Sequence, residues 1–250
     1  AGHFGRYRAA DWLYVTDADE FLNLKTGVAT LDELFEATGP ADAVSFTSVA
    51  FNSNGQKYAS SDPVTQRFTQ TSTDFEGAAA AEEPALTAVK TLFRNSVVGP
   101  RRPHRPVTNE FSATGLKWIN GSGAQLPASW TDGSGKAIDG FGTRDFAQVN
   151  HYAIKSAAEF LLKVDRGDAV NADRLGASEK YWTHGNRTGV ADKSGVGLSV
   201  EGKEMYDYFL SDPELRALHE ESFDIREAQL ADILKTDGGE KLARAIGYFD

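Results

Sequence analysis

Two aspartates, Asp17 and Asp19, form the part of this sequence best suited to chemistry with a metal ion. They directly follow residues 12–16, an apolar and aromatic run that predicts a short buried strand. Open α/β sheets bind their ligands at the carboxyl ends of strands. Carboxylate oxygens suit Mg²⁺ or Mn²⁺, which keep coordination positions open for substrate phosphates. The pair therefore predicts a divalent cation that neutralises a diphosphate and acts as a Lewis acid on its departure.

The same two aspartates also have a simpler interpretation. Asp is a favoured turn residue, and Asp-x-Asp alone is a weak motif, so both side chains could merely cap a turn. A helix-loop-helix calcium site is excluded, because it needs Gly at its sixth position and Glu at its twelfth. Counted from Asp17, those positions hold Leu22 and Val28.

A second candidate site lies at a predicted junction between a strand over 146–152 and a helix. Ser156 and Glu159 form a capping box that opens this helix, which is expected to run to about residue 165. The amino end of a helix offers N–H groups and a positive dipole end, and Lys155 stands just before it. Lys155 and Ser156 are therefore predicted to bind a diphosphate.

Positive charge also gathers in residues 99–106, where prolines favour an extended backbone. This segment is expected to recognise an anionic acceptor or the leaving diphosphate. The alternative is an extended loop in solvent, and it fits Arg101 and Arg102 nearly as well.

The composition limits the protein classes to be considered. A chain of 250 residues with 40% hydrophobic residues can bury a core, and a formal net charge of −10 argues against general nucleic-acid binding. The absence of cysteine excludes disulfides and a thiolate nucleophile. No apolar run approaches the roughly 18 residues of a transmembrane helix, and no secretory signal is evident, so we expect a cytoplasmic protein.

The remaining pattern predicts an α/β chain. Thr30 and Glu33 form a capping box before a helix over 31–38. Further strands are predicted over 42–51, 64–69 and 89–94, and the first two, with a turn at 52–55 between them, form a hairpin or a β-excursion.

Later segments have a different character. Residues 72–87 show no period, and residues 99–145 are dominated by loops. Residues 200–246 are mostly helical, with Asp212-Pro213 starting one helix and Gly238-Gly239 ending another.

Residues 11–22 resemble the strand and metal motif of bacterial family-2-like glycosyltransferases with the GT-A fold. Further pieces resemble the same family in the same order over about residues 11 to 190, namely 43–55, 66–68, 90–94, 104–106, 150–152, 155–156 and 166–167. The Asp-x-Asp-Glu-Phe and His-Tyr-x-x-Lys-Ser pieces are the specific ones, whereas the Gly-rich middle is not.

The resemblance implies roles for individual residues. Asp19 would coordinate the metal, Asp17 would contact the metal or the donor ribose, and His151 would complete the metal shell. His104 and Arg105 match the family pattern and are assigned to binding of the donor or its phosphates. A lone histidine is more often structural, so that interpretation of His151 stays open.

The implied function is transfer of a sugar from a nucleotide-diphosphate donor to a glycan or other hydroxyl acceptor, with Mn²⁺ or Mg²⁺ bound by Asp-x-Asp. An inverting transfer also needs a carboxylate base. Glu110, Asp139 and Asp145 are the candidates, and each could equally be a surface acid. The alternatives are a non-catalytic carbohydrate-binding or scaffold protein with a degenerate GT-A fold, and a metal-dependent phosphoryl-transfer or hydrolytic enzyme.

The implied fold is a GT-A-like (Rossmann-like) mixed sheet flanked by helices over residues 1–190, with a helical extension over 191–250. In GT-A enzymes, strand-helix units that hold the nucleotide base precede the metal motif. Because this chain starts immediately before that motif, we expect an N-terminally truncated domain that binds nucleotide weakly and is inactive alone.

Overall fold

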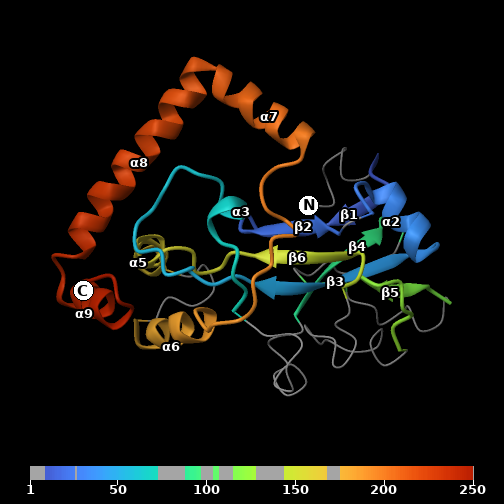
Figure 1. The fold of residues 1–250 in the computed structure, drawn as a ribbon, viewed down its shortest axis with the longest axis horizontal. Helices are drawn as coiled ribbons and strands as arrows, with labels where there is room; N and C mark the ends of the chain where they lie inside the picture. The colour runs from blue at the N-terminus through green and yellow to red at the C-terminus, as the bar shows by residue number, and fades with distance from the viewer. Residues whose placement is uncertain are drawn as a thin grey trace. The chain divides into compact units, whose positions relative to one another are not determined.

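The computed structural model describes residues 9–25, 27–72, 88–96, 104–106, 115–127, 144–167 and 175–249. Figure 1 shows the elements in chain order: β1 (Trp12–Tyr14), β2 (Glu20–Leu24), α2 (Leu31–Thr38), β3 (Ala43–Ala50), α3 (Val64–Arg67), β4 (Val89–Arg94), β5 (Trp118–Asn120), β6 (Ala147–His151), α5 (Ala157–Arg166), α6 (Leu175–Gly185), α7 (Val200–Ser211), α8 (Pro213–Ile233) and α9 (Asp237–Ala245). The predicted α/β class is confirmed. The narrower GT-A assignment stays a prediction.

The chain forms two compact units. The first comprises Ala1–Ala50 and Thr73–His151, and the second comprises Phe51–Ser72 and Tyr152–Asp250. The sequence predicted a GT-A-like domain over residues 1–190 and a helical extension over 191–250, and this division stays a prediction.

The first unit contains a six-stranded mixed sheet with the order β1-β4-β3-β6-β2, and β5 pairs with β3. Strand β3 is antiparallel to β4 and parallel to β5 and β6. Both outer strands, β1 and β2, run antiparallel to their neighbours. A central strand with parallel partners is typically buried, and β3 is buried over most of its length.

Side chains alternate between the two faces of this sheet, and the register fixes which of them share a face. One face of the sheet carries the larger of its two apolar clusters, and Leu34 and Phe35 of α2 cover this cluster. The strand residues in the cluster are Trp12, Tyr14, Leu22, Leu24, Val44, Phe46, Leu92, Ile119, Ala147 and Val149. Phe46 lies opposite Lys90, and Glu20 lies opposite His151. The alternation therefore places Lys90, Glu20 and His151 on this same face.

Helix α2 begins and ends where the sequence predicted. The Thr30 hydroxyl accepts from the Glu33 backbone N–H at 3.2 Å, and the Glu33 carboxylate accepts from the Thr30 N–H at 3.1 Å. These bonds and one from the Ala29 N–H lower the pKa of Glu33. Leu34 is fully buried, so the capped helix is fixed to the sheet.

The second unit corrects one prediction. Residues 64–69 are not a strand, because Val64–Arg67 form the short helix α3. The buried Arg67 guanidinium reaches Glu159 of α5 at 2.7 Å, and the Gln56 side chain donates to the Arg67 carbonyl at 2.7 Å. These tertiary bonds override the strand pattern. The turn at 52–55 is present, with Asn54 and Gly55 both at positive φ.

The C-terminal helices agree with the sequence except at Gly238 and Gly239. Asp212 caps α8 as predicted, accepting from the Glu214 and Leu215 N–H groups. The two glycines do not end a helix but lie in the first turn of α9, which Thr236 caps. Gly239 is required there by close approach, because a Cβ on it would lie 2.0 Å from the Ile233 carbonyl oxygen.

We therefore expect Gly239→Ala to destabilise the second unit by about 1–3 kcal/mol, since α9 must move away from the end of α8. Urea unfolding followed by circular dichroism measures the change. Gly238→Ala is the matched control, because Gly238 is exposed in the same turn and Ala favours helix. Equal stability of the two variants would show that the close approach has no energetic weight.

No helix in the described ranges combines the length and the apolarity that a membrane span requires.

Candidate functional site

The segment that contains Asp17 and Asp19 joins β1 to β2, and we call it the acidic turn. It is held together by Glu20, the first residue of β2. The Glu20 carboxylate accepts from the Asp17 backbone N–H at 3.0 Å and from the Thr16 hydroxyl at 3.4 Å. The Glu20 N–H in turn donates to the Asp17 carbonyl at 3.1 Å. The turn is thus fixed by its own side chain, and Asp17 stands at its exposed corner.

Lys90 of β4 forms ion pairs with two carboxylates of this turn. Its ammonium nitrogen lies 2.8 Å from Asp17 Oδ2 and 2.8 Å from Glu20 Oε2. The Lys90 side chain is 1% exposed, against 66% for Asp17 and 4% for Glu20. The hydrogen bond from Lys90 lowers the pKa of Asp17. Burial lowers the pKa of Lys90, but its bonds to Asp17 and Glu20 outweigh burial and leave that pKa raised.

No role was predicted for Lys90 or Glu20. The available signal was a lysine inside β4, whose other residues from Val89 to Phe93 are apolar or Thr. A cation in a buried strand needs a carboxylate partner, and the acidic turn provides two.

His151 reaches the other side of the acidic turn. It ends β6 directly opposite Glu20, and its Nε2 lies 3.8 Å from Asp19 Oδ1. Charge on His151 and His104 also contributes to the lowered pKa of Asp17. The structure therefore brings together the three residues predicted to bind metal, Asp17, Asp19 and His151.

Neither a protein-family model nor a curated protein matches the chain. The interpretation of the site therefore depends on its own chemistry.

Asp19 and His151 lie close together without a direct hydrogen bond between them. At 3.8 Å the two atoms are too far apart for a hydrogen bond. Asp17 is already bound to Lys90, and within the described ranges no group of three or more His, Cys, Asp or Glu is arranged to hold a metal. Binding of Mg²⁺ or Mn²⁺ by Asp19 and His151 stays a prediction.

His104 and Arg105 contact residues of β4 and β5. His104 Nδ1 is 3.1 Å from the Val89 carbonyl, and its own carbonyl accepts from the Thr91 hydroxyl at 3.0 Å. Arg105 is 5% exposed, with its guanidinium 6.0 Å from the centre of the Trp118 ring. Both residues are held by β4, β5 or their neighbours, and their predicted phosphate role stays a prediction. Arg101 and Arg102 lie outside the described residues.

Lys155 and Ser156 belong to the second unit, where the predicted capping box is present. The buried Ser156 hydroxyl lies 2.6 Å from the Glu159 carboxylate. The N–H groups of Ala157 and Ala158 donate to the carbonyls of Gln56 and Lys57. A phosphate at this helix end would have to replace these bonds.

Lys155 itself differs from its neighbours. It has a φ of 55°, in the left-handed region that few residues other than glycine adopt. No hydrogen bond or ion pair links its side chain to another described residue. Lys155 is thus a half-buried cation at this junction, and its predicted role in binding the donor stays a prediction.

Of the predicted catalytic bases, only Asp145 lies in the described residues, and it is not at the acidic turn. Asp145 is exposed and precedes β6, whereas His151 ends that strand, so the two lie about 20 Å apart at roughly 3.3 Å per residue. Glu110 and Asp139 lie outside the described residues.

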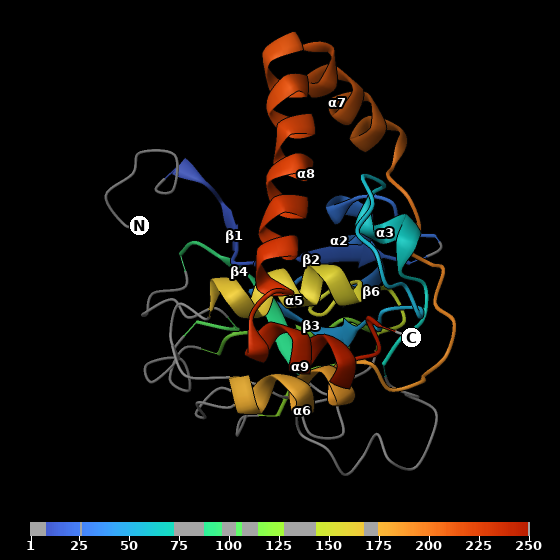
Figure 2. The same ribbon diagram turned by 90° about the vertical axis from the view of Figure 1, so that its left-hand side faces the viewer.

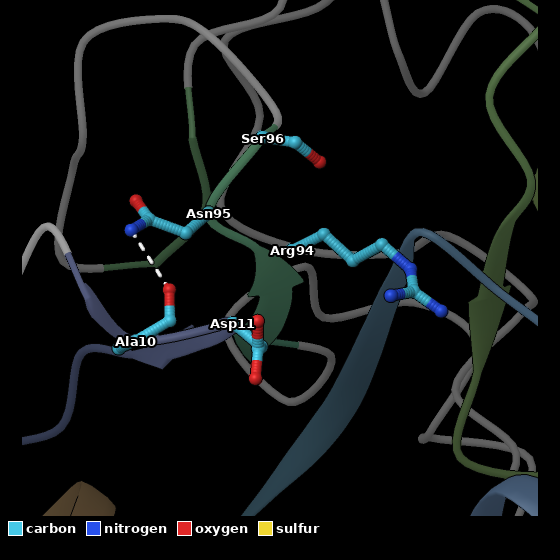
Figure 3. Close-up of a pocket in the computed structure, with 5 residues that line it drawn as sticks. All are labelled: Ala10, Asp11, Arg94, Asn95 and Ser96. Atoms are coloured by element: carbon cyan, nitrogen blue, oxygen red, sulfur yellow. Dashed lines mark hydrogen bonds between the residues drawn. The ribbon is translucent and has the colours of Figure 1, made fainter.

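A polar hollow of about 340 Å³ lies at the opposite end of β1 from the acidic turn. Figure 3 shows its lining residues, which are Ala10, Asp11, Arg94, Asn95 and Ser96. The Asn95 side chain donates to the Ala10 carbonyl at 2.9 Å, while Arg94 turns away to lie over the Trp12 ring. Arg94 pairs with Trp12 and Leu92 pairs with Tyr14, so the hollow and the acidic turn are separated by the length of the strand pair. The hollow is not part of the candidate site.

Proposed function

We propose that this chain carries the metal-binding and acceptor-side part of a glycosyltransferase, which moves a sugar from a nucleotide-diphosphate donor to a glycan or other hydroxyl acceptor. The observation that carries the proposal is the meeting of Asp17, Asp19 and His151 at one end of the mixed sheet. The proposal implies a GT-A-like arrangement of that sheet, with the acidic turn at the carboxyl end of β1.

Each residue of the acidic turn has a role in this proposal. Asp19 and His151 are the residues that would hold Mn²⁺ or Mg²⁺, with their 3.8 Å separation as the supporting distance. The bound cation would supply positive charge that stabilises the departing nucleoside diphosphate. Asp17, held by Lys90 and exposed to solvent, would face the cation or the donor ribose.

Glu20 and Lys90 are positioning residues in this proposal. Their buried ion pair fixes the backbone of the turn, so that the Asp17 and Asp19 carboxylates need little reorganisation when the donor binds. A lysine at this place also limits the negative charge that two aspartates and a glutamate would otherwise concentrate. The turn can then receive one divalent cation and an anionic diphosphate together.

Calorimetric titration tests this function. We expect the protein to bind Mn²⁺ more tightly in the presence of a nucleoside diphosphate than in its absence, because the phosphates would supply further oxygen ligands beside the carboxylates. A panel of nucleoside diphosphates identifies the base, and nucleoside monophosphates serve as the control. Binding of the nucleotides that is unchanged by a chelator would refute the metal-dependent function.

The Lys90 ammonium favours a second candidate, a non-catalytic carbohydrate-binding protein with the same fold. In that protein Lys90 would provide all the positive charge that the acidic turn needs. Such a protein binds a glycan with an affinity that is the same with and without chelator. A glycan array probed in Mn²⁺ and in chelator separates the two functions.

A further inference from the structure

The helices α7 and α8 carry a large apolar surface that the chain leaves exposed. Six side chains on these helices contribute to it, namely Met205, Tyr208, Phe209, Leu215, Leu218 and Ile225. Tyr208 is 70% exposed and Phe209 is 51% exposed. Isolated exposed apolar residues are ordinary, but a contiguous group marks an interaction site. We call residues 200–225, which carry these six side chains, the helical arm.

The spacing of these residues defines one stripe on each helix. Met205, Tyr208 and Phe209 are separated by three and four positions along α7. On α8, Leu215, Leu218 and Ile225 are separated by three and seven positions. These are the spacings of helices whose apolar faces pack against another helix.

The arm has little support from the rest of the second unit. Helix α7 has no buried residue, and the only buried residue of α8 is Ile233 near its carboxyl end. Leu230 and Leu234 join Ile233 at that end, packing near α5 and α9. Figures 1 and 2 show α7 and the first half of α8 extending beyond α5 and α9. Among the described elements α7 packs mainly against α8. A helix of 12 residues with no buried residue is marginally stable in water, so a further contact would stabilise α7.

The charge of these helices indicates what that contact is. Residues 200–233 contain ten carboxylates and three Lys or Arg side chains, a formal charge of −7 out of −10 for the whole chain. Such a surface repels anionic lipid headgroups. It also repels a second copy of itself, because a twofold interface places the same acidic patch on both sides. It attracts a cationic partner that also presents apolar side chains.

We propose that the helical arm docks a basic amphipathic helix of a partner protein, with an apolar face of Leu-like residues bordered by Lys or Arg. Tyr208 and Phe209 are the central contacts, because rigid aromatic side chains dominate the binding energy of interfaces. The acidic residues around the stripe attract the basic flanks of the partner. This proposal is independent of the acidic turn and of the glycosyltransferase function.

Synthetic peptides of about 18 residues, long enough to form a helix on binding, test the proposal. One peptide alternates Leu and Lys at helical spacing, a second replaces Lys with Glu, and a third keeps the Leu and Lys content but scrambles their order. Fluorescence anisotropy measures binding to the full chain. We expect only the first peptide to bind, with an affinity that decreases as salt is raised. Equal binding of the Glu peptide or of the scrambled peptide would overturn the proposal.

Substitutions on the arm locate the site. Replacing Tyr208→Ser and Phe209→Ser together is expected to weaken binding at least about tenfold. The matched control is Lys203→Gln with Asp207→Asn, which removes an exposed ion pair from α7 and keeps the net charge unchanged. The control should bind within about twofold of the original chain, since surface ion pairs contribute little. Circular dichroism of both variants verifies that α7 and α8 are retained.

Two further measurements distinguish other occupants of the arm. Sedimentation measures self-association, and vesicles containing an anionic lipid measure membrane binding. Self-association that the Tyr208→Ser and Phe209→Ser variant abolishes would replace the proposal with a homodimer. Vesicle binding lost in the same variant would replace it with a membrane contact.

Discussion

Lys90→Met is expected to destabilise the protein by about 3 kcal/mol at neutral pH. Removing one partner of a buried ion pair typically costs about 3–5 kcal/mol, because it leaves the other charge buried without compensation. Here that charge is the Glu20 carboxylate, whose side chain is 4% exposed. The lower end of the range is expected because Asp17, the second partner, is open to solvent. Urea unfolding followed by tryptophan fluorescence measures the loss.

A double-mutant cycle shows whether the loss comes from this ion pair. Glu20→Gln removes the buried charge, so Lys90→Met should cost less in the Glu20→Gln background than in the original chain. We expect a coupling of about 1–3 kcal/mol between the two positions. Additive effects of the two substitutions would show that Lys90 acts through its packing alone.

The pH dependence of the Lys90→Met effect provides a further check. The pKa of folded Lys90 is raised above 10.5, so its contribution is complete below pH 10.5 and declines as pH rises through the folded value. The pKa of folded Asp17 is lowered below 3.8, so its contribution is complete above pH 3.8 and declines as pH falls through the folded value. The stability difference between the original chain and Lys90→Met should therefore be largest between about pH 4 and pH 10.

Asp19→Ala is expected to weaken binding of Mn²⁺ with a nucleoside diphosphate at least about 100-fold. Loss of a residue that merely supports a metal ligand costs about 10–100-fold in affinity, so loss of a ligand should cost more. Calorimetry under the conditions of the original titration measures this change. Stability should hardly change, because Asp19 takes no part in the Lys90 ion pairs.

The control for this experiment is Asp32→Ala, which removes an exposed carboxylate from α2 in the same unit. It changes the net charge equally, so it accounts for general attraction between an acidic protein and a cation. If Asp19→Ala and Asp32→Ala bind Mn²⁺ alike, Asp19 is not a metal ligand, and the proposed function loses its main support.

The sequence predicted those elements whose boundaries are set by local bonds. The helices α2 and α5 begin at capping boxes formed within four residues, and both start where predicted. Strand β4 matches its prediction because its apolar run is buried on both faces. Local chemistry was sufficient in each case.

The elements that the sequence did not predict depend on distant partners. Residues 64–67 have a strand-like pattern, but bonds to Glu159 and Gln56 fix them as a helix. Strand β2 was not predicted, because Glu20 and Asn23 are unusual in a strand and its partner β6 is far along the chain. The helix α6 was also not predicted.

The residues of the candidate site also differ in whether the sequence alone could identify them. Asp17 and Asp19 were identifiable from their type and spacing, whereas His151 required the family resemblance. Lys90 and Glu20 were missed because their importance arises from tertiary contact between β4 and the acidic turn. Of the three base candidates, the structure places only Asp145, away from the acidic turn.

The position of β2 at the edge of the sheet has a consequence for synthesis on the ribosome. Among the described strands its neighbour is β6, and the paired strands bring Asn23 next to Asn150, 127 residues later in the chain. At about 5–20 residues per second, β2 waits about 6–25 s for this partner to be made. Until then the nascent chain presents an unpaired strand beside the acidic turn, and Asp19 has no His151 nearby. The site is thus among the last parts of the first unit to assemble.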